Sequence, residues 1–184
     1  MRRILIVPVG VVDEALTSYL SLFLAERLEA EVSVAPEPLL ADFAYDPVRR
    51  QHHSTKILDA LARGREESGQ KILGVIDADL HIPILTFVFG EAHLGGPAAT
   101  FSLTRLRPTF YGLPEDSELF YHRAEKEALH ELGHAFGLVH CASFDCAMHF
   151  SSGVEEVDLK GDDFCEDCRR RLDGGGPAPK PPRG

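Results

Sequence analysis

Three histidines, one glutamate and two glycines lie within eleven residues of this 184-residue chain, at a spacing that suits a metal site. The segment reads HELGHAFGLVH, with His130 and His134 four residues apart. An α-helix turns by about 100° per residue, so these two imidazoles share one helix face and can bind one ion. Gly137 can adopt the left-handed conformation that ends a helix, and the following turn can bring His140 to the same ion.

Three histidine ligands leave a fourth tetrahedral position for water, which distinguishes a catalytic zinc site from a closed structural one. Zinc lowers the pKa of bound water to about 7. Glu131 stands beside the ligands, where such motifs carry a general base and not a ligand. The pattern therefore predicts metal-dependent hydrolysis of an amide bond. The alternative is a helix whose histidines are hydrogen-bonded within a core.

All four cysteines of the chain follow this motif. Cys141 and Cys146 form a CxxxxC pair, and Cys165 and Cys168 form a CxxC pair, both at spacings found in structural zinc sites. We therefore expect a second zinc ion bound by four thiolates. Two disulfides are a competing interpretation, but the chain shows no secretory signal and a reducing cytosol disfavours them. A redox CxxC is also disfavoured, because such pairs usually begin a helix after a strand, whereas this pair lies in a polar C-terminal region.

The combination of HExxHxxGxxH, CxxxxCxM and CxxC resembles the archaemetzincins, a branch of the metzincin zinc peptidases. Stretches 74–83, 87–96 and 105–112 also look like that family. The resemblance implies a zinc peptidase fold with a methionine turn at Met148 beneath the catalytic metal. Outside this context Met148 would be assigned to core packing.

The resemblance also implies a role for each motif residue. The catalytic zinc would bind His130, His134 and His140, with Glu131 as base, and the second zinc would bind the four cysteines. The ligand count predicts two zinc ions per chain. Because His140 and Cys141 are consecutive, the second zinc would brace the third histidine ligand.

Composition narrows the possible partners of the chain. Its formal net charge is −10, which would repel phosphates, so neither nucleic acid nor an anionic membrane surface is expected as partner. No apolar run reaches the roughly 18 residues that span a bilayer. Residues 1–10 are too short for a signal peptide. We therefore expect a cytoplasmic protein that acts on a peptide or protein substrate.

Apolar periodicity predicts an α/β fold. We expect the elements strand 4–9, helix 13–30, strand 31–35, helix 54–65 and strand 71–76. This βαβαβ order indicates a mainly parallel, twisted sheet with right-handed crossovers. Further strands are expected at 85–89 and 98–103, and the short Gly95-Gly96-Pro97 connection favours antiparallel pairing at one edge.

The pattern and the resemblance together predict one metzincin-like catalytic domain over residues 1–172. Its first part, about 1–137, would hold the mixed sheet and an active-site helix at 117–136. Its second part, about 138–172, has few apolar runs and would fold around zinc more than around a core. Residues 173–184 are rich in glycine and proline and are expected to form a flexible tail.

An antiparallel edge strand above the active-site helix could hold an extended peptide by strand addition, because its outer backbone groups are unpaired. We expect segment 90–103 to form this rim, with an ordinary edge hairpin as the alternative. Two functions follow from the motifs. The first is a zinc peptidase, and the alternative is a zinc-stabilised peptide-binding or structural protein with little turnover.

Overall fold

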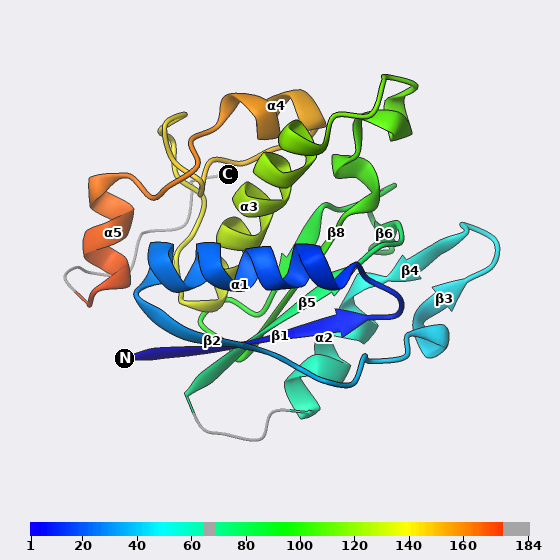
Figure 1. Ribbon diagram of the computed structural model, residues 1–184, viewed down its shortest axis with the longest axis horizontal. Coiled ribbons are helices and arrows are strands. Elements are labelled where there is room, and N and C mark those ends of the chain that lie inside the picture. Colours follow the sequence, from blue (N-terminus) through cyan, green and yellow to red (C-terminus); the bar gives the residue numbers. More distant parts are fainter. Residues whose placement is uncertain (65–68, 175–184) are drawn as a thin grey trace.

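A twisted five-stranded sheet forms the centre of the computed structural model, which describes residues 1–64 and 69–174 (Figure 1). From one edge to the other the strands are β2 (Ala30–Val34), β1 (Arg2–Val9), β5 (Gln70–Ile76), β8 (Ala98–Ser102) and β7 (Gly90–Ala92). Neighbouring strands are parallel except for the edge strand β7, which runs antiparallel to β8. The predicted mixed sheet with one antiparallel edge strand is confirmed.

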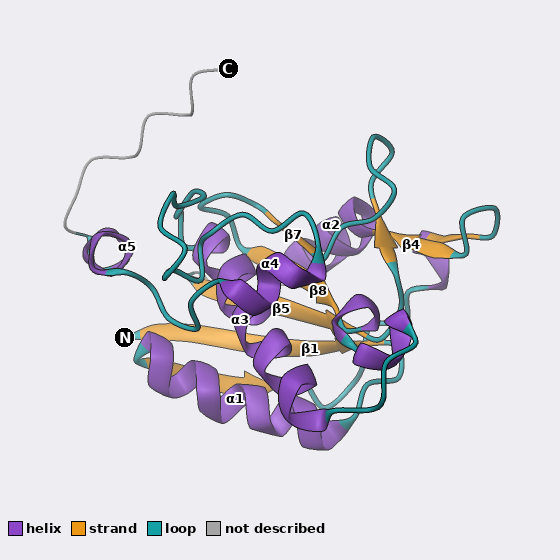
Figure 2. Cartoon of the chain, turned by 90° about the horizontal axis from the view of Figure 1, so that it is seen from above, coloured by secondary structure: helices purple, strands orange, loops and turns teal. Residues whose placement is uncertain are grey.

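The helices cover both faces of this sheet. The helical elements are α1 (Glu14–Leu28), α2 (Ser54–Arg63), α3 (Ser117–Ala135), α4 (Val154–Leu159) and α5 (Glu166–Leu172), with short 3-10 turns η1 (Asp42–Ala44), η2 (Thr104–Leu106) and η3 (Pro108–Tyr111). Helices α1 and α3 pack against one face of the sheet, while α2 packs against the other (Figure 2). Position 65, where α2 was expected to end, lies outside the described residues.

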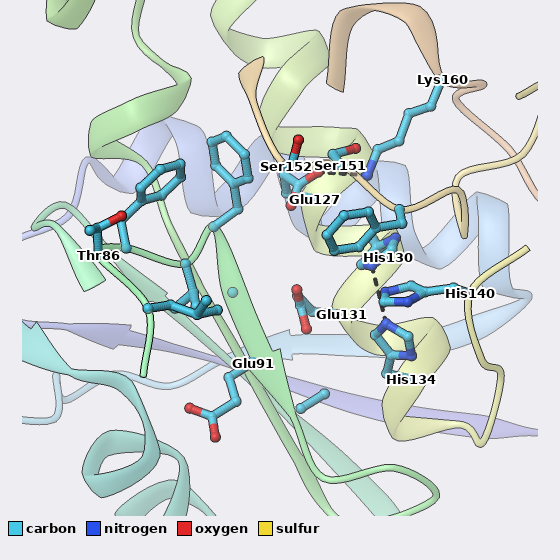
Figure 3. A pocket seen from close by; sticks show the side chains of 17 residues that line it. Thr86, Glu91, Glu127, His130, Glu131, His134, His140, Ser151, Ser152 and Lys160 are labelled. Carbon is cyan, nitrogen blue, oxygen red and sulfur yellow. Dashed lines mark hydrogen bonds and ion pairs between the residues drawn. The ribbon is translucent and has the colours of Figure 1, made fainter. Parts of the chain in front are cut away.

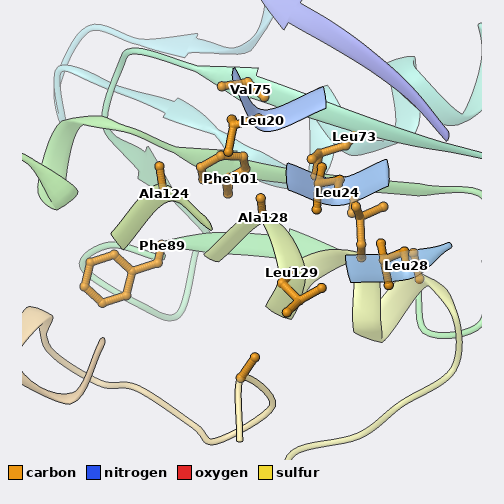
Figure 4. Packing of buried hydrophobic residues seen from close by; sticks show 14 of the residues in the cluster. Leu20, Leu24, Leu28, Leu73, Val75, Phe89, Phe101, Ala124, Ala128 and Leu129 are labelled. Carbon is orange, nitrogen blue, oxygen red and sulfur yellow. The ribbon is translucent and has the colours of Figure 1, made fainter. Parts of the chain in front are cut away.

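Alternation along the strands explains why both faces are covered. In β5, Leu73 and Val75 point into the core beneath α1 and α3, whereas Ile72 and Ile76 point into the core beneath α2. Successive side chains of a strand face opposite sides of a sheet, so a continuous apolar run needs cover on both. Leu24 of α1 lies in the first core (Figure 4).

Helix α3 begins where its sequence provides a cap. The side chain of Asp116 accepts a hydrogen bond from the backbone N–H of Leu119 at 2.9 Å, which satisfies one of the free donors of the first turn. Along the helix, Ala124 and Ala128 are fully buried against the sheet. Their small side chains let α3 lie close to β8, so the end of the helix is positioned by direct packing.

One local expectation was wrong. Segment 85–89 is not a strand, and the edge strand begins only at Gly90. The reason lies in its carbonyls, because Gln51 donates to the carbonyl of Thr86 at 2.8 Å and Arg49 donates to that of Leu85 at 2.9 Å. At Leu85 and Thr86, side chains therefore take the places that a neighbouring strand would fill, whereas Val88 forms a single antiparallel bridge with Leu80. The donors come from or beside a small sheet that was not predicted, made of β3 (Tyr45–Asp46), β4 (Gln51–His53) and β6 (Leu80–His81).

The segment after α3 joins the main core more than was expected. Val154, Val157 and Phe164 are buried in the same apolar cluster as α1 and α3. At the far end, Asp173 pairs with Arg2 of β1 at 2.6 Å, and residues 175–184 of the expected tail lie outside the described residues. Within 1–64 and 69–174, no helix is both long and apolar enough to cross a membrane.

Replacing Leu24 with alanine should lower the free energy of unfolding by about 2–5 kcal/mol, because its side chain is 0% exposed and the change leaves a cavity. Urea denaturation measures this loss. Leu22 lies on the same helix but is 74% exposed, so Leu22→Ala should change stability by no more than about 0.5 kcal/mol. Equal losses in the two variants would contradict this account of the core.

Candidate active site

The three motif histidines converge at the end of α3 (Figure 3). His130 and His134 lie one turn apart on the helix, which ends in a turn at Gly137 with a φ of 95°. That left-handed conformation favours glycine, and it reverses the chain so that His140 faces the helix. One nitrogen from each of the three rings lies within 4.8 Å of the other two.

Backbone carbonyls orient two of these rings. Nδ1 of His130 lies 2.7 Å from the carbonyl oxygen of Ala147, and Nδ1 of His134 lies 2.8 Å from that of Leu138. A carbonyl can only accept, so each Nδ1 carries the proton and each Nε2 is left with a lone pair. The two Nε2 atoms face each other at 3.1 Å. Two lone pairs directed at one point are what a cation satisfies, so the residues fit a metal.

Burial keeps these imidazoles in the form that binds metal. Desolvation lowers the pKa of His130 well below the usual 6.5, and it also lowers the pKa of His134. For His140, burial and then the nearby charge of His134 lower the pKa to about 4. The three rings are therefore neutral at pH 7.

Glu131 lies beside the histidines and faces the pocket. A Cβ atom built at Gly90 of β7 would lie 2.5 Å from its Oε1 atom, so only glycine leaves room for this carboxylate. Burial, followed by the negative charge of Glu127, raises the pKa of Glu131 well above its usual value. A carboxyl with a raised pKa at a cleft is suited to proton transfer near neutral pH.

A cavity of about 430 Å³ opens in front of these residues. One wall is the segment 85–92, and the other is the end of α3. In the first wall Phe87 and Phe89 pack edge to face, with their ring centroids 5.4 Å apart. The ring of Phe150 packs against that of His140, with the centroids 5.1 Å apart. The cavity therefore combines apolar surface with the cluster of three histidines at one end.

The two walls are joined at the turn between β7 and β8. Gly95 has a φ of 66° and donates its N–H to the carbonyl of His134 at 2.9 Å. A Cβ atom at Gly95 would lie 4.0 Å from the Cα atom of Gly137, so the turn sits directly against the end of α3. The hairpin and α3, which carries His130 and His134, are thus hydrogen-bonded to each other.

The four cysteines form a second cluster close to the first. All are free thiols, and their sulfur atoms lie within 4.8 Å of one another. A disulfide requires about 2.05 Å between sulfurs, whereas Sγ of Cys141 and Sγ of Cys165 are 3.8 Å apart, so the disulfide interpretation is wrong for this structure. Burial raises the pKa of Cys146 to about 11 and raises that of Cys168 even further.

Backbone contacts connect the cysteine cluster to the histidines. Cys141 directly follows His140 in the chain, and its N–H donates to the carbonyl of Met148 at 2.9 Å. Met148 is fully buried, and a Cβ atom at Gly133 would lie only 2.3 Å from its sulfur. The glycine of the HELGH segment therefore makes room for the methionine beneath the helix.

Sequence reasoning missed one pair of residues at the pocket, Glu127 and Lys160. Their side chains are 2% and 0% exposed, and Nζ of Lys160 lies 2.6 Å from Oε1 of Glu127. Both line the cavity. Glu127 could have been found, because it precedes His130 by three residues and so shares its helix face. Lys160 gave no such signal.

Comparison with known proteins bears directly on these clusters. The model for peptidase family M54 matches residues 38–174. An archaemetzincin from Methanocaldococcus jannaschii is 40% identical over 172 residues, which cover 94% of this chain and 93% of the relative. An archaemetzincin from Thermococcus kodakarensis is 39% identical, with 94% and 96% covered.

Solved structures share the fold. The archaemetzincin of Archaeoglobus fulgidus, complexed with malonate, has 38% identity and a TM-score of 0.80, covering 92% of this chain and 99% of that chain. A zinc-dependent peptidase from Methanocorpusculum labreanum has 30% identity and a TM-score of 0.82, with the same shares covered. The resemblance noted in the motifs thus extends over nearly the whole chain.

Lowering the pH from about 8 to about 6 should weaken zinc binding much more at the cysteines than at the histidines. Zinc must displace protons from Cys146 and Cys168, because the pKa values of both thiols are raised. Each displaced proton lowers the apparent zinc affinity about tenfold per pH unit, so two protons lower it about 100-fold. The histidines have lowered pKa values, so zinc has fewer protons to displace from them in this range. Chelator competition at several pH values measures both affinities. The same pH dependence at both sites would contradict these protonation states.

Proposed function

This chain belongs to peptidase family M54, the archaemetzincins, and from that premise we propose that it hydrolyses peptide bonds at the histidine cluster. The family makes it a zinc metallopeptidase. The residues proposed to bind the catalytic zinc are His130, His134 and His140. The observation that carries the proposal is the pair of Nε2 lone pairs facing each other at 3.1 Å beside a buried carboxylate.

The chemistry of the donor set supports this assignment. Bound zinc would supply Lewis-acid polarisation of the scissile carbonyl and would activate water for attack near neutral pH. The carbonyls of Ala147 and Leu138 hold the rings of His130 and His134 in one tautomer, so neither ring has to reorient when the substrate enters. The Phe150 ring packs against the ring of His140 and adds apolar surface at the same end of the cavity.

Glu131 is proposed as the general base. Its position in the pocket wall, opposite Gly90, supports a role at the scissile bond. It would take the proton from the attacking water and pass it to the nitrogen of the scissile bond. The protonated nitrogen leaves as a neutral amine, whereas the unprotonated one is a poor leaving group. The raised pKa of Glu131 supports the second transfer, because the protonated form is easily reached near neutral pH.

A second zinc ion is proposed on Cys141, Cys146, Cys165 and Cys168. Their mutual distances and the buried thiols support a closed structural site with no position for water. This ion would fix Cys141 and thereby His140, its neighbour in the chain. On this proposal residues 1–172 act as one catalytic domain whose part from about 138 onward depends on zinc for its shape.

An extended peptide is the proposed substrate form. Strand β7 has one neighbour, β8, and its other side borders the cavity. Free backbone groups there could pair with a peptide across the histidines, which supports the expected rim over an ordinary hairpin. The strand is only three residues long, Gly90–Ala92, so such pairing would be local to the reacting bond.

Replacing Glu131 with glutamine should reduce kcat for peptide cleavage by about 10²–10⁴-fold, because the amide cannot accept the water proton. Turnover of a mixed peptide library, followed by mass spectrometry, measures the loss, and zinc content should remain at two per chain. Glu125→Gln serves as the matched control, since Glu125 is a buried glutamate of the same helix that bonds Tyr19 on another face. Cleavage that survives Glu131→Gln, or a wild-type protein that binds zinc but cleaves nothing, would favour the peptide-binding alternative.

A further inference from the structure

The buried pair of Glu127 and Lys160 is the feature that the proposed chemistry does not use. Lys160 follows α4 in the chain and crosses to α3, where its Nζ atom lies 2.6 Å from Oε1 of Glu127 (Figure 3). A buried ion pair is costly to desolvate, and replacing such pairs with apolar residues is often neutral for stability. Stability alone therefore does not explain the pair, and its position next to the histidines indicates a role at that site.

The chain on either side of Lys160 is clamped to the segment that contacts His130. Gly161 donates its N–H to the carbonyl of Phe144 at 2.8 Å, and Asp163 accepts from the N–H of Ala147 at 2.8 Å. A Cβ atom at Gly161 would lie 2.5 Å from the carbonyl carbon of Asp145, so the two segments touch along their backbones. We call residues 144–147 and 160–163 together the clamp.

The clamp contacts α3 at two points, and these contacts form a closed series of interactions that we call the circuit. At one point Lys160 of the clamp pairs with Glu127. At the other, the carbonyl oxygen of Ala147 lies 2.7 Å from Nδ1 of His130. His130 lies three residues after Glu127, on the same helix face. The ion pair is thus the second point at which α3 holds the clamp beside this ring.

From this circuit we propose that Glu127 and Lys160 are positioning residues, which hold the Ala147 carbonyl against His130 and so aim its Nε2 at the catalytic metal. Their side chains are at most 2% exposed, and in this role they act on the metal site through the Ala147 carbonyl. The inference rests on the proposed function, because it requires metal at the histidines. It assigns a specific task to a lysine far from the motif in sequence.

The test uses the full chain with Co²⁺ as the probe. Cobalt at the four thiolates gives sulfur-to-metal charge-transfer absorption that cobalt at the histidines lacks, so chelator competition yields one affinity for each site. The main variant is the double replacement Glu127→Met with Lys160→Met, which leaves no unpaired buried charge. We expect it to fold, to bind cobalt at the histidines about 10–100-fold more weakly, and to keep its affinity at the cysteines.

A spectroscopic readout separates positioning from general stability. In protein labelled with ¹⁵N-histidine, the Nδ1 proton of His130 should give a downfield, slowly exchanging resonance in the wild type, because it is bonded to a carbonyl. This resonance should broaden or disappear in the double variant. Lys126→Met is the matched control. Lys126 also joins α3 to the end of α4, through the carbonyls of Val157 and Asp158, but lies outside the cavity.

Three outcomes are distinguishable. Weaker binding at the histidines in the double variant, with Lys126→Met unchanged, supports the proposal. Wild-type affinity together with an intact His130 resonance in the double variant overturns it, even where Lys160→Met alone unfolds the protein. Absence of cobalt from the histidines of the wild type would instead refute the proposed function, since the circuit would then have no metal to serve.

Discussion

The structure depends on burying a helix that carries charge. Twelve of the nineteen residues of α3 are buried, and five of them are polar or ionisable, namely Arg123, Glu125, Glu127, His130 and Glu131. Burying a polar group is costly without a partner, and Arg123, Glu125, Glu127 and His130 each have one. The helix therefore dictates where its partners must lie, and most of those partners come from the chain that follows it.

Those partners give the C-terminal region its shape. Arg123 donates to both carboxylate oxygens of Asp158, at 2.6 and 2.7 Å. Lys160, two residues after Asp158, donates to the carboxylate of Glu127. The carbonyl of Ala147 completes the set at His130. A stretch with only two short helices is thus ordered by hydrogen bonds and ion pairs to one long helix, with apolar contacts from Val157 and Phe164 in addition.

The predictable parts of this protein were those whose cause is local in sequence. The ligand spacing of His130 and His134 follows from the helical repeat, and the parallel sheet follows from apolar runs such as that of β5. The rest depended on distant partners. The segment 85–89 reads as a strand until Gln51 and Arg49 occupy two of its carbonyls. Lys160 is one lysine among several until the fold sets it against Glu127, 33 residues earlier.

The hydrogen bond between Gly95 and the carbonyl of His134 has a consequence for how a polypeptide enters. That bond ties the turn between β7 and β8 to the end of α3, where the zinc ligands are proposed to lie, so it restrains how far the two walls of the cavity can move apart. If a substrate lies along β7 in extended form, as proposed, its own chain must give up its folded conformation first. On that proposal, susceptibility to cleavage would be a property of local unfolding in the target.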